Sequence, residues 1–257
     1  MYKPESECRP RWRGIDYAYE AVNCCKCPVW YNLKHPNQYQ NAQQQQTDEA
    51  VWRFDNLEVV KKIAYFAERH MISETRSAHE FEHVKRVYGI AMSIGNKIGA
   101  DLKILSAAAL LHDIGRSKEE KYGISHSILS GEMSEEILRN VGYDDDEIAR
   151  VKTVIRTHRY SEDLHPTSLE GEILSDADKL DALGAIGIFR GIAQATVCKS
   201  GIEGFLKHSD EKLLKLHELM HTEEAKELAE RRHAIIASFV KELRNELKQA
   251  SRISFHE

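Results

Sequence analysis

The sequence lacks several features that would place it in a specialised class of protein. It contains no run of about 20 uncharged apolar residues, so we expect no membrane-spanning helix and no membrane partner. No apolar run follows the charged residues at the N-terminus, so the pattern of a secretory signal is not met. Positive charge is not in excess, and a net charge of −5 argues against a broad nucleic-acid-binding surface.

Cysteine is scarce outside the N-terminal segment. Four of the five cysteines lie before residue 30. An odd number clustered in this way does not indicate a disulfide framework, so a reducing cytoplasm is the expected compartment. Cys24 and Cys27 have the CxxC spacing, with Cys8 and His35 as candidate partners. This is a weak zinc or iron–sulfur signal, because a single CxxC without a clean second pair is more often not a metal site.

Strand patterns are also missing. Val, Ile and Thr never alternate with polar residues over the length of a strand, so the sequence predicts an all-α fold. Residues 1–54 have no helical period and carry a Gln run at 43–46, which predicts a partly disordered, Cys-containing extension. Residues 55–250 form the expected folded domain. About eight helices are predicted there, near 56–70, 79–98, 102–113, 126–140, 144–158, 170–190, 210–220 and 222–249.

Three polar anomalies lie on apolar helix faces. His112 and Asp113 end an otherwise apolar segment, LKILSAAALLHD, and His83 is in line with Val87 and Ile90. Asp178 stands in a string of carboxylates between two apolar segments. Each feature alone fits a solvated helix end, a core histidine or a solvated acidic edge. Together they favour a shared divalent ion, because buried or crowded carboxylates need a cation and imidazole with carboxylate suits one.

This order of residues, His…His-Asp…Asp on an all-α scaffold, resembles the signature of the HD superfamily of metal-dependent phosphohydrolases. The local sequences resemble it as well: AHEFEHVKRVY around His83, AAALLHDIGR around His112 and ILSDADKLDALGAIGIFRG around Asp178. The later stretch EKLLKLHELMHTEEAKELAERRHAI is similar to the C-terminal part of a subgroup of small, stand-alone bacterial and archaeal members. The resemblance covers residues 55–245, in four separate blocks that agree in order and spacing.

The resemblance implies an HD-domain helical bundle in which His83, His112, Asp113 and Asp178 hold one divalent ion. Mn, Fe, Co, Ni, Zn and Mg are all compatible with this ligand set. It also implies hydrolysis of a phosphate ester, with a nucleotide or another small phosphorylated metabolite as the expected substrate. Such an ion would acidify a bound water and polarise a phosphoryl oxygen.

Further residues near these motifs are candidates for the same chemistry. Arg116, and less so Lys118, follow the His-Asp pair and are placed to neutralise phosphate charge, with solvated loop cations as the alternative. His126 and His158 stand at predicted helix ends, and histidines at comparable places hold a second ion in some HD enzymes. The alternatives are a helix-capping His126 and a His158 favoured by the helix dipole. Lys179 is expected to pair with a neighbouring aspartate, Asp176 or Asp181, instead of substrate.

Two rival interpretations remain open. Residues 79–83 read His-Glu-Phe-Glu-His, the HExxH pattern in which His79 and His83 would bind zinc and Glu80 would be the base of a metalloprotease. That pattern leaves His112, Asp113 and Asp178 unexplained, and His79 is then a helix-start residue near His83. The second rival is a ligand-binding or regulatory HD protein without turnover, since a metal site can be kept for stability alone.

Overall fold

The computed structural model describes residues 48–71, 78–159, 162 and 164–250. This part of the chain contains α-helices and one 3₁₀ helix, η5, and no strand, which confirms the all-α prediction. Most of the predicted extension, residues 1–54, lies outside the described residues, as do Cys8, Cys24, Cys27 and His35. The first helix of the described residues begins at Asp48, ahead of the predicted domain start at residue 55, and the division into extension and domain stays a prediction.

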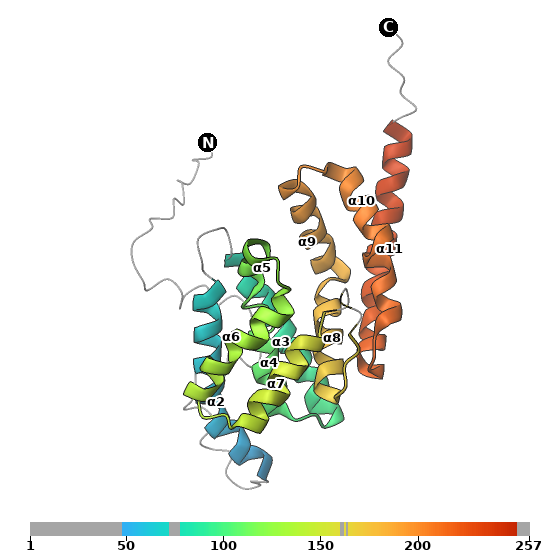
Figure 1. Ribbon diagram of the computed structural model, residues 1–257. Helices are drawn as coiled ribbons and strands as arrows, with labels where there is room; N and C mark the ends of the chain where they lie inside the picture. Colours follow the sequence, from blue (N-terminus) through green and yellow to red (C-terminus); the bar gives the residue numbers. More distant parts are fainter. Residues whose placement is uncertain (1–47, 72–77, 160–161, 163, 251–257) are drawn as a thin grey trace, which may run out of the picture. The chain divides into compact units, whose positions relative to one another are not determined.

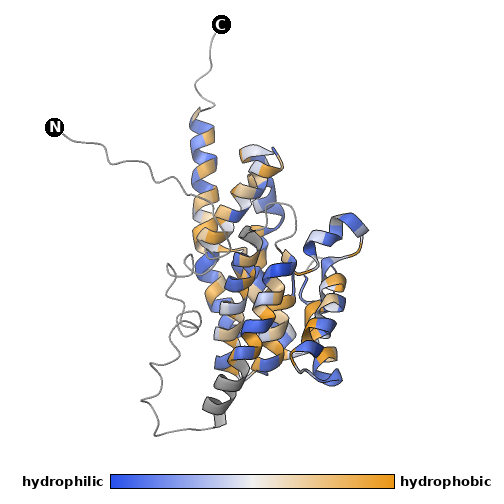
Figure 2. Cartoon of the chain, turned by 90° about the vertical axis from the view of Figure 1, so that its left-hand side faces the viewer, coloured by the Kyte–Doolittle hydropathy of each residue, from blue (hydrophilic) through white to orange (hydrophobic). Residues whose placement is uncertain are grey.

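The helices follow one another with short connections (Figure 1). In chain order they are α2 (Asp48–Met71), α3 (Ala78–Ile98), α4 (Leu102–Leu111), α5 (Arg116–Tyr122), α6 (His126–Asn140), α7 (Asp145–Thr157), α8 (Leu169–Asp181), α9 (Gly184–Val197), α10 (Gly201–Glu211), η5 (Leu213–Leu219) and α11 (Glu223–Ala250). Hydrophobic and hydrophilic segments alternate along most of them, as expected for helices with one buried face (Figure 2).

Helix α4 forms the centre of this body, as its apolar sequence predicts. Every residue from Ile104 to Leu111 is buried. The helix packs against α2, α3, α7 and α8, while α6 covers α7. Truncating a fully buried side chain here, such as Leu105 or Leu110, should destabilise the fold by about 2–5 kcal/mol. Because α4 is held on all sides, the His112-Asp113 pair at its end has a fixed position.

The predicted helix over 170–190 is in fact two helices. Its break lies at Gly184, whose φ of +70° is readily adopted only by glycine, and the axes of α8 and α9 differ by 67°. A side chain at this position would also meet Arg232. The prediction of one helix was therefore wrong, and the bend turns α9 away from the direction of α8 so that α9 packs against α10 and α11.

Other helix boundaries divide into confirmed and missed ones. The starts of α7 and α11 agree with the predicted ones: Asp144 forms a full capping box with Glu147, and the Thr222 hydroxyl accepts the Ala225 N–H. Gly115 follows the end of α4 and precedes α5, and its φ of −88° is one that any residue adopts. It is instead a site of close packing, because a Cβ there would lie 2.6 Å from the Cβ of Leu129.

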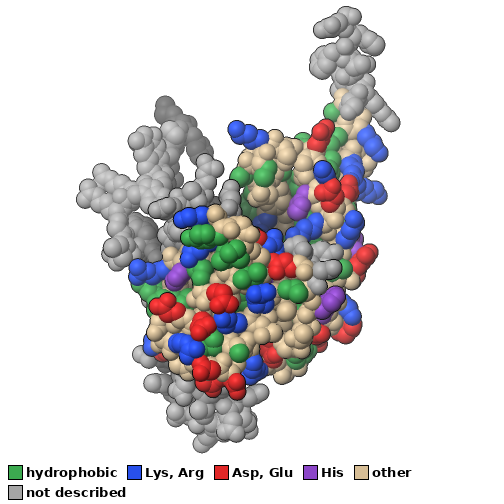
Figure 3. All heavy atoms as spheres, in the orientation of Figure 1, with side chains coloured by type: hydrophobic (Ala, Val, Ile, Leu, Met, Phe, Trp, Pro, Cys, Tyr) green, Lys and Arg blue, Asp and Glu red, His purple; other side chains and the backbone are tan. Residues whose placement is uncertain are grey.

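Two short elements, α5 and α10, were not predicted, and η5 is a 3₁₀ rather than an α-helix. Among the described residues no single helix is long and apolar enough to cross a membrane. Only α8 and α9, taken together across their bend, reach that length and composition. On the face shown in Figure 3, acidic and basic side chains are interspersed, and the surface is hollowed beside α9.

Candidate metal centre

The four predicted ligands lie together at the junction of three helices. They are His83 on α3, His112 and Asp113 at the end of α4, and Asp178 on α8. The Nε2 atom of His83 is 3.2 Å from Oδ1 of Asp178 and 3.8 Å from Oδ2 of Asp113. The Nε2 atom of His112 is also 3.8 Å from Oδ2 of Asp113. The fold thus brings His83 and Asp178, which are 95 residues apart in the sequence, into one cluster.

A second cluster shares Asp113. The Nε2 atom of His126, at the start of α6, lies 3.3 Å from Oδ1 of Asp113. His158, at the C-terminal cap of α7, completes a group whose potential ligand atoms are all within 4.8 Å of one another. The three residues are buried. Oδ2 of Asp113 therefore lies near His83 and His112, and Oδ1 lies near His126.

The Nδ1 atoms of the four histidines are all held by hydrogen bonds. In His112 and His158 the Nδ1–H donates to the backbone oxygens of Ala109 and Ile155, at 2.9 and 2.5 Å. Since a carbonyl only accepts, Nδ1 carries the proton and Nε2 keeps its lone pair for a ligand. Carboxylates bind the Nδ1 atoms of the other two rings, His83 and His126.

One carboxylate stands behind each of the remaining histidines. Nδ1 of His83 lies 2.7 Å from Oδ2 of Asp181, and Nδ1 of His126 lies 2.9 Å from Oε2 of Glu119. Each three-residue group thus has one histidine oriented by a backbone carbonyl and one oriented by a carboxylate. This arrangement behind a ring is the usual support for a metal-binding histidine.

Four buried polar atoms in this region have no hydrogen-bond partner: Nε2 of His83, His112 and His126, and Oδ1 of Asp113. Leaving a buried polar atom unpaired costs about 1–3 kcal/mol. Four unpaired polar atoms so close together are unusual, because the Nδ1 atoms of the same histidine rings all have hydrogen-bond partners. Imidazole nitrogens and carboxylate oxygens are suitable ligands for a divalent cation, so the donor set fits a metal ion.

The electrostatics of the cluster keep the ligands in metal-binding form. Burial by itself would raise the pKa of Asp113, but His112, Arg116 and His83 hold it well below its ordinary value. Burial lowers the pKa of His112, which favours its neutral ring. His83 differs, because the nearby carboxylates of Asp178 and Asp181 outweigh burial and raise its pKa to about 9. An ion bound at Nε2 of His83 would therefore displace a proton.

The three aspartates on α8 have three different tasks. Asp178 faces the cluster. Asp181 holds His83 from behind. Asp176 accepts hydrogen bonds from the backbone N–H groups of His221 and Thr222 and so fixes the start of α11. Lys179 lies 4.0 Å from Asp176, the pairing expected from the sequence, and donates to Ser175.

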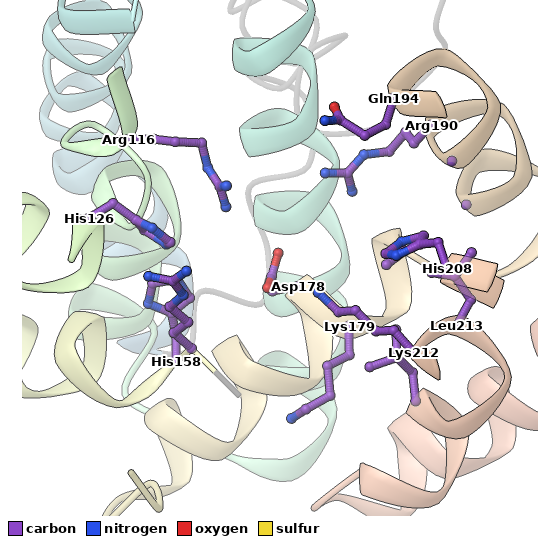
Figure 4. Close-up of a pocket in the computed structure, with 15 residues that line it drawn as sticks. Arg116, His126, His158, Asp178, Lys179, Arg190, Gln194, His208, Lys212 and Leu213 are labelled. Atoms are coloured by element: carbon purple, nitrogen blue, oxygen red, sulfur yellow. The ribbon is translucent and has the colours of Figure 1, made fainter. Parts of the chain in front are cut away.

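A cavity of about 340 Å³ opens onto the cluster. Figure 4 shows Arg116, His126 and His158 on one side, Arg190, Gln194, His208 and Lys212 on the other, and Asp178 between them. Arg116 donates to Oδ2 of Asp113 at 2.7 Å and is still 43% exposed, so part of its guanidinium faces the cavity. Lys118, the weaker of the two predicted cations, is not among the lining residues.

Several residues of the site were missed by the sequence analysis. They are Glu119, Arg159, Asp181, Arg190, His208 and Lys212. Arg190, Lys212 and His208 belong to α9 and the α10–η5 region, whose course depends on the bend at Gly184. Glu119 lies on α5, a short polar helix without an apolar stripe to predict it. The side chains of His79 and Glu80 lie outside the described part, so the HExxH interpretation is not tested by their positions.

Comparison with known proteins agrees with this geometry. A family model, the HD domain, matches residues 81–183, the interval that contains all seven predicted site residues. The YpgQ protein of Bacillus subtilis is 34% identical over 184 residues, which is 69% of this chain and 88% of YpgQ.

The similar solved structures include YpgQ and two HD-superfamily hydrolases. A crystal structure of B. subtilis YpgQ in complex with ADP has a TM-score of 0.63 at 29% identity, covering 75% of this chain and 97% of that one. An HD-superfamily hydrolase from Bacillus thuringiensis has a TM-score of 0.60 at 28% identity, covering 74% and 97%. A predicted HD-superfamily hydrolase from an uncultured Thermotogales bacterium has a TM-score of 0.56 at 30% identity, covering 79% and 99%.

Proposed function

This chain belongs to the HD superfamily, and from that premise we propose that it hydrolyses a phosphate ester of a nucleotide or a comparable small metabolite in a metal-dependent reaction. The observation that carries the proposal is the convergence of unpaired Nε2 and Oδ1 atoms in a buried cluster, next to a cavity that is lined by Asp178, His126 and His158 and by several cationic side chains. A phosphorylated substrate fits both parts of the site. The proposed metal ion would contact the reacting phosphoryl group, and the cationic side chains would neutralise the phosphate charge.

The proposed ligands of the ion are His83, His112, Asp113 and Asp178. When bound, a divalent ion supplies a water of lowered pKa and polarises the phosphoryl oxygen. The protein contributes the fixed direction of each ring, through Ala109 O and the carboxylate of Asp181. His83, His112 and Asp113 are buried, which limits competing water on their side of the cluster, while Asp178 is 31% exposed and faces the cavity.

Two groups are proposed to act on the substrate directly. Arg116 binds a phosphoryl oxygen with the part of its guanidinium that does not contact Asp113. His126 and His158 face the same cavity, and burial lowers the pKa of both rings, so they are neutral near pH 7. A neutral ring with Nδ1 protonated has a lone pair on Nε2, which would hold a second ion or, where none is bound, accept a hydrogen bond from the attacking water or from a protonated phosphate.

A nucleotide is the preferred substrate for two reasons. The cavity volume of about 340 Å³ is within the range of small-molecule sites, roughly 300–1,000 Å³. In addition, the related YpgQ was crystallised with ADP. The lining offers several cations and few apolar side chains, so phosphate charge should contribute more to binding than the base does.

The test is a hydrolysis screen on metal-stripped protein. Nucleotides and sugar phosphates are each supplied with Mn²⁺, Co²⁺, Ni²⁺, Zn²⁺ or Mg²⁺, and released phosphate or larger phosphorylated products are measured. We expect hydrolysis of at least one nucleotide that requires added metal and is lost in Asp178→Ala. Tight ADP binding with no turnover under any metal would instead establish a ligand-binding protein and contradict the proposal.

A further inference from the structure

We propose that Asp181 is a positioning residue that directs Nε2 of His83 toward the metal and links this ligand to Arg190 in the wall of the substrate cavity. The inference rests on the proposed function, since it concerns a ligand of the proposed ion. Asp181 itself touches neither the cavity nor the other predicted ligands; it is fully buried behind His83.

Four donor contacts converge on the Asp181 carboxylate. Oδ1 accepts Nε of Arg86 at 2.6 Å. Oδ2 is contacted by Nδ1 of His83 at 2.7 Å, Nη2 of Arg86 at 3.0 Å and Nη1 of Arg190 at 2.7 Å. Two positively charged arginines contact the single negative charge of the Asp181 carboxylate. They keep Asp181 ionised, so that it accepts hydrogen bonds and favours a proton on the facing Nδ1 of His83.

An asparagine at position 181 could not make the same contacts as Asp181. Asparagine has one accepting oxygen and one donating NH₂ group. With the NH₂ toward His83, Nδ1 must become an acceptor, and the ring proton moves to Nε2, where it blocks the ion. With the NH₂ toward Arg86, two donors face each other at the position where Arg86 Nε now donates. Both orientations therefore disturb the ligand or its support.

Arg190 extends the contact into the cavity. Nη1 of Arg190 donates to Oδ2 of Asp181 at 2.7 Å and to the backbone oxygen of Asp181 at 3.3 Å. The side chain is 37% exposed and lines the cavity opposite Arg116 (Figure 4). Its remaining nitrogens are available to a phosphate. One carboxylate thus fixes both a metal ligand and a cation of the opposite wall.

The experiment compares Asp181→Asn with a matched variant on the same helix. Asp176→Asn also changes a fully buried aspartate that accepts three hydrogen bonds, but those bonds cap α11. Metal-stripped full-length proteins are titrated with Mn²⁺, and free Mn²⁺ is followed by electron paramagnetic resonance. We expect Asp181→Asn to weaken Mn²⁺ binding about 10- to 100-fold. Asp176→Asn should lower thermal stability and leave Mn²⁺ affinity as in the unchanged protein.

Arg190→Gln separates the two parts of the inference. It should raise the KM for a phosphorylated substrate while Mn²⁺ affinity changes much less than in Asp181→Asn. Equal Mn²⁺ affinity in Asp181→Asn and the unchanged protein would overturn the positioning role. Failure of the unchanged protein to bind Mn²⁺ would instead overturn the proposed metal site, so the two failures are distinguishable.

A measurement without any variant covers the case in which Asp181→Asn does not fold. The unchanged protein is loaded with Cd²⁺ and its ¹⁵N-labelled histidines are observed by NMR. Every coordinated ring should couple to cadmium through Nε2 and carry its proton on Nδ1. A ring coordinated through Nδ1, or a His83 without coupling, would contradict the arrangement behind it.

Discussion

Oδ1 of Asp113 lies 3.3 Å from Nε2 of His126, on the opposite side of the carboxylate from His83 and His112. One aspartate is therefore common to two groups of potential ligands, and the second group adds His158. A carboxylate shared in this way is suited to bridge two ions. The sequence alone favours the second ion less than the first, because two histidines at predicted helix ends do not by themselves show that they face the same aspartate.

The geometry predicts that the second group binds an ion of its own. His126→Gln should reduce the metal content at saturation from two ions per chain to one, since it removes a ligand that the first group does not use. His165→Gln, a change at an exposed loop residue, serves as the control and should keep both. Equilibrium dialysis with elemental analysis measures the count. If the unchanged protein already saturates at one ion, the two histidines act on substrate alone.

Arg116 should bind phosphate rather than metal. Arg116→Ala is expected to raise KM about 10- to 100-fold, because a charge-assisted hydrogen bond contributes roughly 1.5–3 kcal/mol. Lys118→Ala, in the same short helix but outside the cavity lining, is the matched control. Steady-state kinetics at saturating metal provide both constants. An unchanged KM in Arg116→Ala would assign this side chain only to the support of Asp113.

The HExxH interpretation makes the opposite forecast for Glu80. In a metalloprotease of that type Glu80 is the catalytic base, so Glu80→Gln would abolish activity. In the proposed HD site, His83 would be a ligand together with His112, Asp113 and Asp178, and that site assigns no catalytic role to Glu80. We expect Glu80→Gln to retain metal-dependent phosphate release. Its loss, with helical content unchanged by circular dichroism, would favour the metalloprotease.

Individual residues show which features of the candidate site could be predicted from the sequence. The apolar segment before His112 and the apolar stripe around His83 placed two candidate ligands on helix faces that are buried, because hydrophobic periodicity reports burial directly. Asp178 was selected from three nearby aspartates by resemblance to the family. The separate tasks of Asp176 and Asp181 could not be predicted, since they depend on which distant helix each one faces.

The cavity wall was not predictable for a different reason. Its position follows from the bend between α8 and α9, and the signal for that bend is one glycine, Gly184, among several small residues in a helical pattern. Glycine within a helical pattern has no single meaning without the φ angle. Arg190 and Lys212 consequently had no predicted relation to the metal ligands.

Residues before α2 should be dispensable for the metal chemistry. All the proposed ligands, and the whole HD match, lie at or after residue 81. A chain shortened to begin at Asp48 should fold, bind its metal with unchanged affinity and hydrolyse substrate at the full rate. Thermal unfolding and the Mn²⁺ titration check this on the purified protein. Insolubility or loss of turnover would show that the preceding segment is part of the enzyme.

The central claim is that the unpaired atoms of His83, His112 and Asp113 form a metal site and that this site performs the hydrolysis. Asp113→Ala tests it most directly, because that carboxylate is the one ligand common to both groups. Metal content by elemental analysis and hydrolysis of the best nucleotide are measured on the same sample, after circular dichroism has shown that the helices are intact. We predict that Asp113→Ala loses bound metal and activity together. Undiminished metal in the folded variant would contradict the account.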